Sequence, residues 1–368
     1  MNAEGRRLLI ISAGMGAGHD AVAAELARRL ARLGADVQVV DVLHLLPLRL
    51  GRLLRGSYHW MIRRAPWLYE VIYRVFFVAK RAPTVSPLTA LAGSRLLRLV
   101  ARRPPDEVIS TFHVAAQVAG ALRRRGRLAA TSTVLVTDFA VHRLWLHPGN
   151  DRYLCPNPAT VPRIAALTGR PVSAHAPVVR PAFLGHGGRT GGRTGAEVRA
   201  RIGAAPEDRL VLISSGSWGV GDIAETARIV ARSGRYVPVV LCGRNAGLRR
   251  RLTGVPAGLV LGWQEDMPAL MAQAHALVDN GAGLTCEEAF AAGLPVVSYR
   301  PIPGHGRDGA LAMARAEVTV HAPDAAALVR ALDQLGDVRR RERLVGRASA
   351  LFHAEPAEAV LLSAPLPR

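Results

Sequence analysis

Residues 276–299 read ALVDNGAGLTCEEAFAAGLPVVSY, and this stretch indicates the fold class of the chain. A short apolar run is broken by the small residues at 281–283, a helical segment carrying Glu287 and Glu288 follows, and Pro295 precedes a second apolar run. The order strand, glycine turn, helix, strand is typical of α/β proteins. The first N–H groups of such a helix lack intrahelical partners and lie at the positive end of its dipole, so the turn can bind a phosphate. The stretch therefore predicts a nucleotide-type ligand.

Length and composition predict two domains and an anionic partner. The chain has 368 residues, 49% of them hydrophobic, and a formal charge of +20 at pH 7. Such a charge favours nucleic acid, phosphorylated substrates or an anionic membrane surface. Cys155, Cys242 and Cys286 form neither a metal-binding knuckle nor a disulfide framework, which favours a reducing compartment. We expect neither a signal peptide nor a membrane-spanning helix, because no apolar run has the required length.

The N-terminal part repeats the order of strand, glycine loop, helix and strand. Residues 8–11 form an apolar run, residues 12–19 form a glycine loop ending in Gly18 and His19, and a second apolar run covers residues 37–42. This order predicts a doubly wound α/β domain. The glycines do not fit the dinucleotide-binding pattern, and the chain lacks a P-loop sequence, so this loop does not identify a nucleotide by itself.

Three polar residues directly follow predicted strands of this domain. His19, His113 and Asp138 each lie just past the carboxyl end of an apolar run. Ligands of open α/β sheets bind at that edge, so the three side chains are candidates for one site. A purely structural role stays open for each, since histidine and aspartate also cap helices and stabilise turns. His142 and His147 have no clear third ligand, and we predict no metal site.

Residues 48–81 combine many arginines with tryptophan, tyrosine and phenylalanine, and contain a single acid, Glu70. A basic, aromatic, amphipathic helix is typical of a segment that lies in a membrane interface. The alternative, a helical insertion packed on its own domain with a solvated basic face, is equally compatible with the pattern. Nucleic acid is not expected as a partner, because no recognised binding module accompanies the charge. The candidate membrane contacts are Trp60, Arg63, Arg64, Trp67 and Arg74.

A glycine-rich segment separates this part from a second α/β pattern. Residues 183–196 cannot pack a core and are the predicted linker between a domain at 1–182 and a domain at 197–335. A helix is expected at 336–353, and residues 354–368 are expected to fray.

Several motifs, in one order, resemble those of the monogalactosyldiacylglycerol synthase and processive diacylglycerol glucosyltransferase family. These proteins are GT-B glycosyltransferases related to the lipid II N-acetylglucosaminyltransferase. The basic aromatic segment stands where family members carry their membrane-binding region. The matching motifs are Gly18-His19, Thr137-Asp138 followed by His142, Trp145 and His147, residues 177–183 (PVVRPAF), residues 242–245 (CGRN), and Gly283-Leu284-Thr285 with Glu288 and residues 291–295 (AAGLP).

The resemblance implies a GT-B fold, in which two Rossmann-like doubly wound domains face each other across a cleft. It also implies an inverting transfer of a hexose from a UDP-sugar to a lipid hydroxyl, with diacylglycerol as the acceptor. The protein would act as a peripheral protein at the cytoplasmic face of the membrane. No metal or other cofactor would be needed, because helix dipoles and backbone N–H groups hold the diphosphate.

The resemblance also implies roles for individual residues. Glu288 would accept hydrogen bonds from the ribose hydroxyls, and His19 or Asp138 would be the general base, with His19 favoured. The acceptor would contact His113, His142 and Trp145. The donor would contact Ser215, Gly216, Gly219, Arg244, Trp263, Met267, Gly283, Leu284, Thr285, Glu288, Gly304 and His305.

The chain departs from the family pattern in the loop that would contact the sugar. Relatives have glycine-glutamine-glutamate where this chain has Gly304-His305-Gly306, a nearby asparagine is replaced within Asp308-Gly309, and Asn280 stands where plant members carry lysine. The identity of the sugar therefore stays open. Two other functions also remain open: a UDP-sugar epimerase of the same architecture, and a non-catalytic protein that binds lipid or nucleotide. The basic aromatic segment disfavours the first, and the joint presence of His19, Asp138 and Glu288 disfavours the second.

Overall fold

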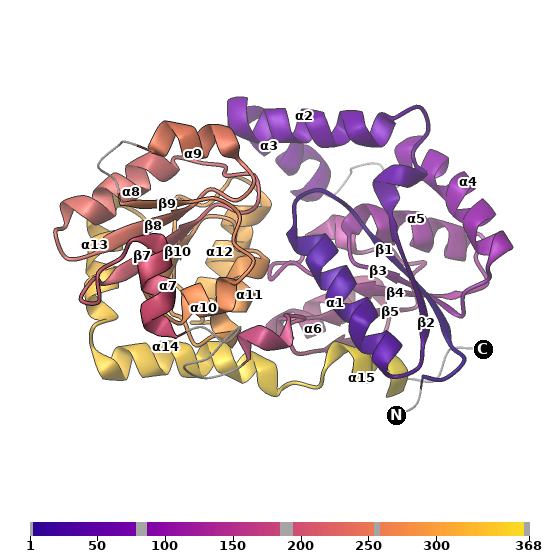
Figure 1. Ribbon diagram of the computed structural model, residues 1–368. Helices are drawn as coiled ribbons and strands as arrows, with labels where there is room; N and C mark the ends of the chain where they lie inside the picture. The colour runs from indigo at the N-terminus through magenta and orange to yellow at the C-terminus, as the bar shows by residue number, and fades with distance from the viewer. Residues whose placement is uncertain (1–2, 79–86, 185–193, 254–257, 364–368) are drawn as a thin grey trace. The chain divides into compact units, whose positions relative to one another are not determined.

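The protein forms two compact units, each built on a six-stranded parallel sheet (Figure 1). The structure, a computed structural model, describes residues 3–78, 87–184, 194–253 and 258–363. Unit 1 contains Met1–Val178 and Leu351–Arg368, and unit 2 contains Val179–Ala350. Both sheets are doubly wound, as the sequence predicts.

The sheet of unit 1 has the strand order β2-β1-β3-β4-β5-β6, with every pair parallel. Its core lies between the apolar faces of these strands and of helices α4 and α5. The strands are β1 (Arg7–Ser12), β2 (Asp36–Asp41), β3 (Glu107–Ser110), β4 (Thr131–Leu135), β5 (Arg152–Cys155) and β6 (Val172–Ala174). The helices are α1 (Gly18–Arg32), α2 (Leu50–Arg64), α3 (Pro66–Ile72), α4 (Pro87–Arg102), α5 (His113–Arg124), α6 (Val161–Thr168) and α15 (Ala357–Ser363).

The basic aromatic segment is not one continuous helix. Helix α2 ends at Arg64, because Ala65 precedes Pro66 and proline disfavours a helical conformation in the residue before it. Helix α3 starts at Pro66 and continues into η2 (Tyr73–Val78), a π-helical turn. Residues 79–86, which include the end of the predicted segment, lie outside the described residues.

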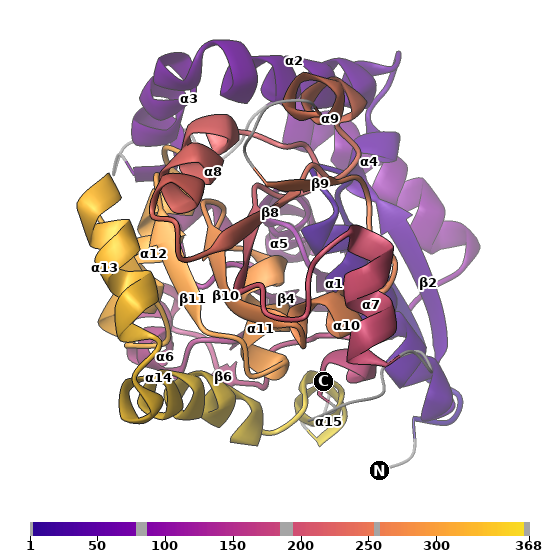
Figure 2. The same cartoon turned by 60° about the vertical axis from the view of Figure 1, so that its left-hand side comes forward.

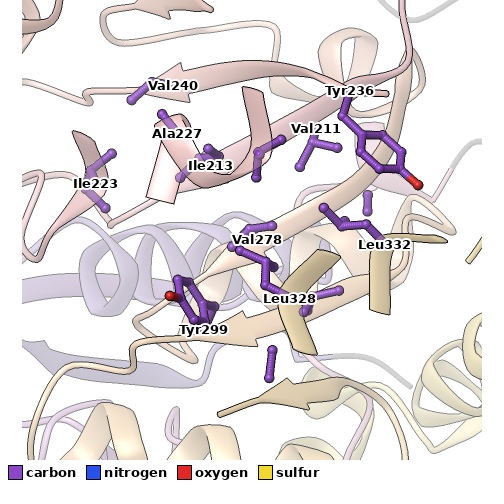
Figure 3. Packing of buried hydrophobic residues seen from close by; sticks show 14 of the residues in the cluster. Val211, Ile213, Ile223, Ala227, Tyr236, Val240, Val278, Tyr299, Leu328 and Leu332 are labelled. Atoms are coloured by element: carbon purple, nitrogen blue, oxygen red, sulfur yellow. The ribbon is translucent and has the colours of Figure 1, made fainter. Parts of the chain in front are cut away.

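The sheet of unit 2 has the order β12-β11-β10-β7-β8-β9 and is also parallel throughout. Helices α8 and α13 pack on the same face of it (Figure 2), where Ile213 and Val278 meet Leu328 and Leu332 (Figure 3). The strands are β7 (Leu210–Ser214), β8 (Val237–Leu241), β9 (Leu259–Leu261), β10 (Ala274–Asp279), β11 (Val296–Tyr299) and β12 (Val320–Ala322). The helices are α7 (Gly195–Ile202), α8 (Ile223–Arg232), α9 (Ala246–Leu252), α10 (Met267–Met271), α11 (Leu284–Ala291), α12 (His305–Arg315), α13 (Ala325–Gln334) and α14 (Val338–Ala350).

The C-terminal segment differs from the sequence-based expectation. The expected helix at 336–353 corresponds to α14 and a short 3-10 turn, but residues 357–363 of the segment that was expected to fray form α15. Residues 364–368 lie outside the described residues. Helix α15 belongs to unit 1, where Leu361 is buried and its carbonyl oxygen accepts a hydrogen bond from Arg152 at 2.9 Å. The burial of its apolar side chains gives the segment an ordered structure that its composition did not indicate.

The division between the units lies at Val178 and Val179, a few residues before the predicted boundary at 182. The short turn η5 (Pro181–Phe183) belongs to unit 2 and contacts α11, and Val179 and Phe183 are buried. Residues 185–193, most of the predicted glycine-rich linker, lie outside the described residues.

Candidate active site

In each unit the strand order reverses beside the first strand. Strand β1 lies between β2 and β3 in unit 1, and β7 lies between β8 and β10 in unit 2. Ligands of open α/β sheets bind at the carboxyl ends of the strands beside such a reversal. In unit 1 this edge carries the loops that end in His19, His113 and Asp138, and in unit 2 it carries the predicted donor-binding loops.

The predicted catalytic residues of unit 1 lie close together, since the rings of His19 and Trp145 are 6.4 Å apart between centroids and Trp145 contacts Asp138. His19 Nδ1 lies 2.7 Å from Thr137 Oγ1. Trp145 Nε1 donates to Asp138 Oδ2 at 2.8 Å, and His142 Nε2 lies 3.4 Å from the same oxygen. Asp138 therefore orients two predicted acceptor-binding side chains, while Thr137 orients the predicted base.

Burial lowers the pKa of His19 below its ordinary value of 6.5, although the nearby charges of Asp138 and Asp20 oppose this shift. The imidazole is therefore neutral at pH 7. A neutral imidazole can accept a proton, which a general base must do. Its ring also packs edge-on against Phe112, at 5.0 Å between centroids.

His113 and His142 form an aromatic wall with a residue of the basic aromatic segment. The two imidazole centroids are 5.1 Å apart, and the Phe77 ring lies 5.3 Å from His113 and 4.8 Å from His142. Tyr73 stacks on Phe77 at 4.9 Å. The sequence indicated no such role for Phe77. π-Helical turns are frequent at functional sites, and η2 brings both rings to the site residues.

His142 has an unused hydrogen-bonding atom. Its side chain is 6% exposed, and Nδ1 has no hydrogen-bond partner within the described part of the chain. Buried polar atoms are rarely left without partners. This nitrogen can therefore bind a polar group of a ligand.

The basic aromatic segment also exposes large apolar and basic side chains to solvent. Trp60 is 58% exposed and Trp67 is 69% exposed. Arg63 and Arg64 are exposed as well. Arg74 is exposed and pairs with Glu70 at 2.8 Å. The further exposed apolar side chains of this segment are Leu48, Leu53, Val71, Val75 and Phe76. Monomeric proteins seldom expose several large apolar groups together unless they bind a partner or a membrane.

In unit 2, the turn between β10 and α11 leaves the start of α11 available to a ligand. The Asp279 carboxylate accepts the N–H groups of Gly281 and Ala282, each at 2.7 Å, and so fixes the turn. No side chain caps α11, and the space beside Gly283 is open. Leu284 and Thr285 form the first turn, whose N–H groups have no intrahelical acceptor. This is the predicted phosphate-binding turn.

Glu288 lies one turn further along α11. Burial raises its pKa from the ordinary value of 4.5 to about 7, and the charge of Arg180 opposes the shift. Its neighbour Glu287 is more deeply buried, in the first turn of the same helix. The two carboxyl groups therefore have different environments, and only Glu288 is partly accessible.

Two further loops of unit 2 carry predicted donor-binding residues. The Arg244 guanidinium lies over the Trp263 ring at 4.4 Å. Trp263 is nevertheless 47% exposed. Met267 is half-buried at the start of α10. An exposed indole held by a cation offers a flat surface on which a nucleobase can stack.

The loop after β7 is shaped by the residues of the CGRN motif. Asn245 donates to the Trp218 carbonyl at 3.0 Å, and Gly219 has φ +61° and no room for a side chain, since a Cβ would lie 2.8 Å from Leu248. Ser215 and Gly216 precede this turn. The Ser215 hydroxyl is buried and without a partner among the described residues, so it is available to a ligand.

The loop before α12 carries the residues that depart from the family pattern. Gly304 has φ +76° and precedes the helix, and His305 is its first residue. A Cβ at Gly306 would lie 3.1 Å from Ile302 Cβ and 3.3 Å from the Asn280 carbonyl oxygen. A Cβ at Gly309 would lie 2.9 Å from Ala282. Helix α12 therefore packs against the phosphate-binding turn through glycines.

Two family models match the chain, one in each unit. The model described as Monogalactosyldiacylglycerol (MGDG) synthase matches residues 19–171, which include His19 and Asp138. The model described as Glycosyl transferases group 1 matches residues 213–337, which include Glu288.

Curated relatives match most of the chain. The processive diacylglycerol beta-glucosyltransferase of Bacillus subtilis (strain 168) is 26% identical over 326 residues, covering 83% of this chain and 80% of that protein. The protein of the same name from Bacillus thuringiensis (strain Al Hakam) is 24% identical over 382 residues, covering 96% of this chain and 92% of that protein. These matches and the family models confirm the resemblance that the motifs indicate.

Solved structures confirm the predicted GT-B fold. Phytolacca americana UGT2 complexed with UDP-2fluoro-glucose and pterostilbene superposes with a TM-score of 0.62 at 12% identity, covering 95% of this chain and 94% of that one. Acinetobacter baumannii MurG superposes with a TM-score of 0.59 at 17% identity, covering 97% and 98%. At these identities the likeness establishes the fold alone.

Proposed function

We propose that this chain, a GT-B glycosyltransferase of the monogalactosyldiacylglycerol synthase and processive diacylglycerol glucosyltransferase family, transfers a hexose from a UDP-sugar to a diacylglycerol-type lipid. The observation that carries this proposal is the arrangement on α11. An uncapped helix start and a partly buried carboxyl group lie one turn apart on one helix, and these are the groups that a diphosphate and a ribose require. The names of the curated relatives support the same donor and acceptor classes.

The donor binds to the carboxyl-edge loops of unit 2. The diphosphate accepts hydrogen bonds from the first N–H groups of α11 and from the Ser215 hydroxyl, while Glu288 accepts from the two ribose hydroxyls. The uracil stacks on Trp263. Gly304 and His305 lie at the start of α12 and contact the sugar.

The reaction is a single displacement with inversion at the anomeric carbon. The lipid hydroxyl oxygen forms the new bond as its proton passes to His19, and the bond from the anomeric carbon to the diphosphate oxygen breaks with its electrons leaving on UDP. The start of α11 stabilises the negative charge that develops on the leaving diphosphate. Within the described residues, no group of three histidine, cysteine, aspartate or glutamate side chains is placed to hold a metal ion.

We assign the base to His19 and an orienting role to Asp138. Oδ2 of Asp138 already accepts a hydrogen bond from Trp145 and lies beside His142, so this oxygen is engaged in orienting those side chains. His19 is neutral because of its burial. The unpartnered Nδ1 of His142 then binds an oxygen of the acceptor, and His113 and Phe77 enclose the acceptor's glycerol end.

The protein reaches its lipid acceptor as a peripheral membrane protein. The exposed tryptophans at 60 and 67 enter the interface, and Arg63, Arg64 and Arg74 contact anionic headgroups, on the cytoplasmic face where UDP-sugars are made. In the described ranges, no helix combines the length and the apolar character needed to cross a bilayer.

The decisive experiment supplies the protein with diacylglycerol in anionic vesicles and, separately, UDP-glucose, UDP-galactose and UDP-N-acetylglucosamine, with mass spectrometry of the lipid fraction. We expect a glycolipid from at least one donor, and none from a Glu288→Ala variant. Absence of any glycolipid with all three donors would refute the transferase proposal. Interconversion of a UDP-sugar without lipid would instead identify an epimerase.

A further inference from the structure

Unit 2 has a strongly basic cavity at the edge of its sheet opposite to the predicted donor-binding loops. The cavity has a volume of about 380 Å³ and lies at the amino ends of β7 and β10 and at the start of α14. Its volume falls within the range of about 300–1,000 Å³ that small-molecule sites occupy. The five residues of β7 separate it from the donor loops by roughly 16 Å. It is therefore a separate site of the same unit.

Arg209 and Arg341 bring two positive charges to this cavity. The Arg209 guanidinium lies over the Tyr236 ring at 5.4 Å, and that ring stacks on His275 at 5.4 Å. Tyr236 belongs to the core of unit 2, where Figure 3 shows it at the end of the packed cluster near Leu332. Arg209 is thus held on a rigid surface rather than free in solvent.

Arg341 is fixed as well. Its Nη1 donates to the His275 carbonyl oxygen at 2.7 Å. Burial lowers the pKa of Arg341, and the nearby charge of Arg209 lowers it further, so the two guanidinium groups repel each other. Neither makes an ion pair with a carboxylate within the described ranges.

The acidic residues nearby are already engaged in other interactions. The Asp208 carboxylate accepts the N–H of Ala205 at 2.7 Å. Asp333 pairs with Arg235 at 3.0 Å and accepts the Tyr236 hydroxyl at 2.9 Å. The third arginine of the wall, Arg199, donates to the carbonyl oxygens of Ala205 and Asp208 and to Gln273, so it has a structural role.

We propose that this cavity binds a phosphate group through Arg209 and Arg341, either as free phosphate or as the phosphate of a phospholipid headgroup. Guanidinium groups match phosphate oxygens with paired, charge-assisted hydrogen bonds, and an anion between the two arginines removes their mutual repulsion. His275 forms part of the wall beside them. This inference concerns a site apart from the donor loops and does not depend on the transferase reaction.

The test measures phosphate binding to the full chain by isothermal titration calorimetry in low-salt buffer, with UDP present to fill the donor loops. Arg209→Gln is the test variant, because the contact of the Arg209 side chain over the Tyr236 ring is not accompanied by a side-chain hydrogen bond within the described residues. Arg340→Gln is the matched control, since Arg340 is an exposed arginine of the same helix as Arg341 and does not line the cavity. We expect the Kd for phosphate to rise at least about tenfold in Arg209→Gln and to stay unchanged in Arg340→Gln.

A second arm distinguishes the two sources of phosphate. Monomeric short-chain phosphatidylglycerol and phosphatidylcholine are titrated into the same three proteins. Arginine-dependent binding of phosphatidylglycerol that is tighter than that of phosphate identifies a lipid headgroup site, and binding of phosphate alone identifies a free-anion site. Equal phosphate affinity in all three proteins would indicate a general counterion effect and would overturn the proposal. A lack of phosphate binding by the wild type would also overturn it. Failure of UDP to bind would count against the transferase, while the difference between Arg209→Gln and Arg340→Gln would still decide this site.

Discussion

The carboxyl group of Glu288 titrates near neutral pH because α11 buries it, and donor binding should therefore depend on pH. With a pKa of about 7, the group is largely protonated at pH 6 and ionised at pH 8. Only the carboxylate can accept hydrogen bonds from both ribose hydroxyls. We expect the Kd for UDP-glucose to rise by up to about tenfold per pH unit below pH 7, measured by calorimetry. UDP-glucose is preferred to UDP because both of its phosphates are diesters and stay ionised over this range.

A Glu288→Gln variant provides the control. Its Kd for UDP-glucose should be higher than that of the wild type and should not change between pH 6 and pH 8. A flat profile in the wild type as well would remove Glu288 from the donor site. The free energy of unfolding depends on pH in the opposite direction: a rise in pH strengthens donor binding but destabilises the ligand-free fold. Because the folded pKa lies above the ordinary 4.5, the ligand-free protein loses stability as the pH rises from about 4.5 to about 7.

His19 and Asp138 should differ in their effects on the rate. Loss of the base in His19→Ala should lower kcat by about 10²–10⁴-fold with little change in the KM for the donor. Asp138→Asn should shift the acidic limb of the kcat profile to lower pH, since the Asp138 charge raises the pKa of His19 and its removal lets burial lower that pKa further. Rates at saturating donor over pH 5 to 8 measure both effects. An unshifted limb in Asp138→Asn would mean that another group is the base.

At the scale of elements, the π-helical turn η2 connects α3, which belongs to the proposed membrane-binding segment, to the candidate site. Phe77 contacts His113 and His142, whereas its neighbour Phe76 is 46% exposed. We expect Phe77→Leu to lower kcat on a soluble short-chain diacylglycerol by about 2- to 12-fold, because an aromatic contact contributes ~0.5–1.5 kcal/mol. Phe76→Leu should leave that rate unchanged and weaken only the binding to vesicles. Equal rates for the two variants on the soluble acceptor would show that η2 does not position the acceptor.

The outer surface of α2 and α3 should bind anionic membranes in a salt-dependent way. Arg63→Gln with Arg64→Gln should weaken vesicle binding by about 1 kcal/mol for each charge in low salt, and the difference should disappear in high salt. Trp60→Ala with Trp67→Ala should weaken binding at both salt concentrations, because burial of an indole is not electrostatic. Flotation with phosphatidylglycerol vesicles measures both. Arg339→Gln with Arg340→Gln, exposed arginines of α14, is the matched control, and an equal loss in this control would assign the effect to net charge alone.

The sequence was sufficient to predict the elements that depend on local signals. Glycine turns between apolar runs indicated both doubly wound sheets, and the residues after each run indicated His19, Asp138 and the turn at Gly283. The contact of Phe77 with His142 could not be predicted, because it depends on a π-helical turn and on packing between segments distant in the sequence. The interruption of the basic aromatic segment at Pro66 was visible in the sequence, yet its amphipathic spacing was read as continuous.

At the scale of the molecule, unit 1 is assembled from two segments far apart in the chain. Helix α15 packs on α1, where Arg29 pairs with Glu358 at 3.3 Å, and Arg152 joins the Leu361 carbonyl to the buried Glu107 carboxylate at 2.9 and 2.7 Å. No property of an alanine- and proline-rich tail indicates this, because the burial of α15 depends on partners that the first part of the chain supplies. The stability of unit 1 should therefore depend on residues that follow unit 2.

A Leu361→Ala variant tests this dependence. Leu361 is fully buried in unit 1, so its truncation should lower the free energy of unfolding of that unit by about 2–5 kcal/mol, a large share of the 5–15 kcal/mol that is usual for a domain. Hydrogen exchange followed by mass spectrometry resolves the units, and we expect faster exchange in β1, β3 and β5 with no change in β7 or β10. Leu362→Ala, a change to a half-buried leucine of the same helix, should have a smaller effect. Equal protection of β5 from exchange in the wild type and in Leu361→Ala would show that unit 1 does not rely on α15. An equal loss of protection in both units would show that the effect is not confined to unit 1.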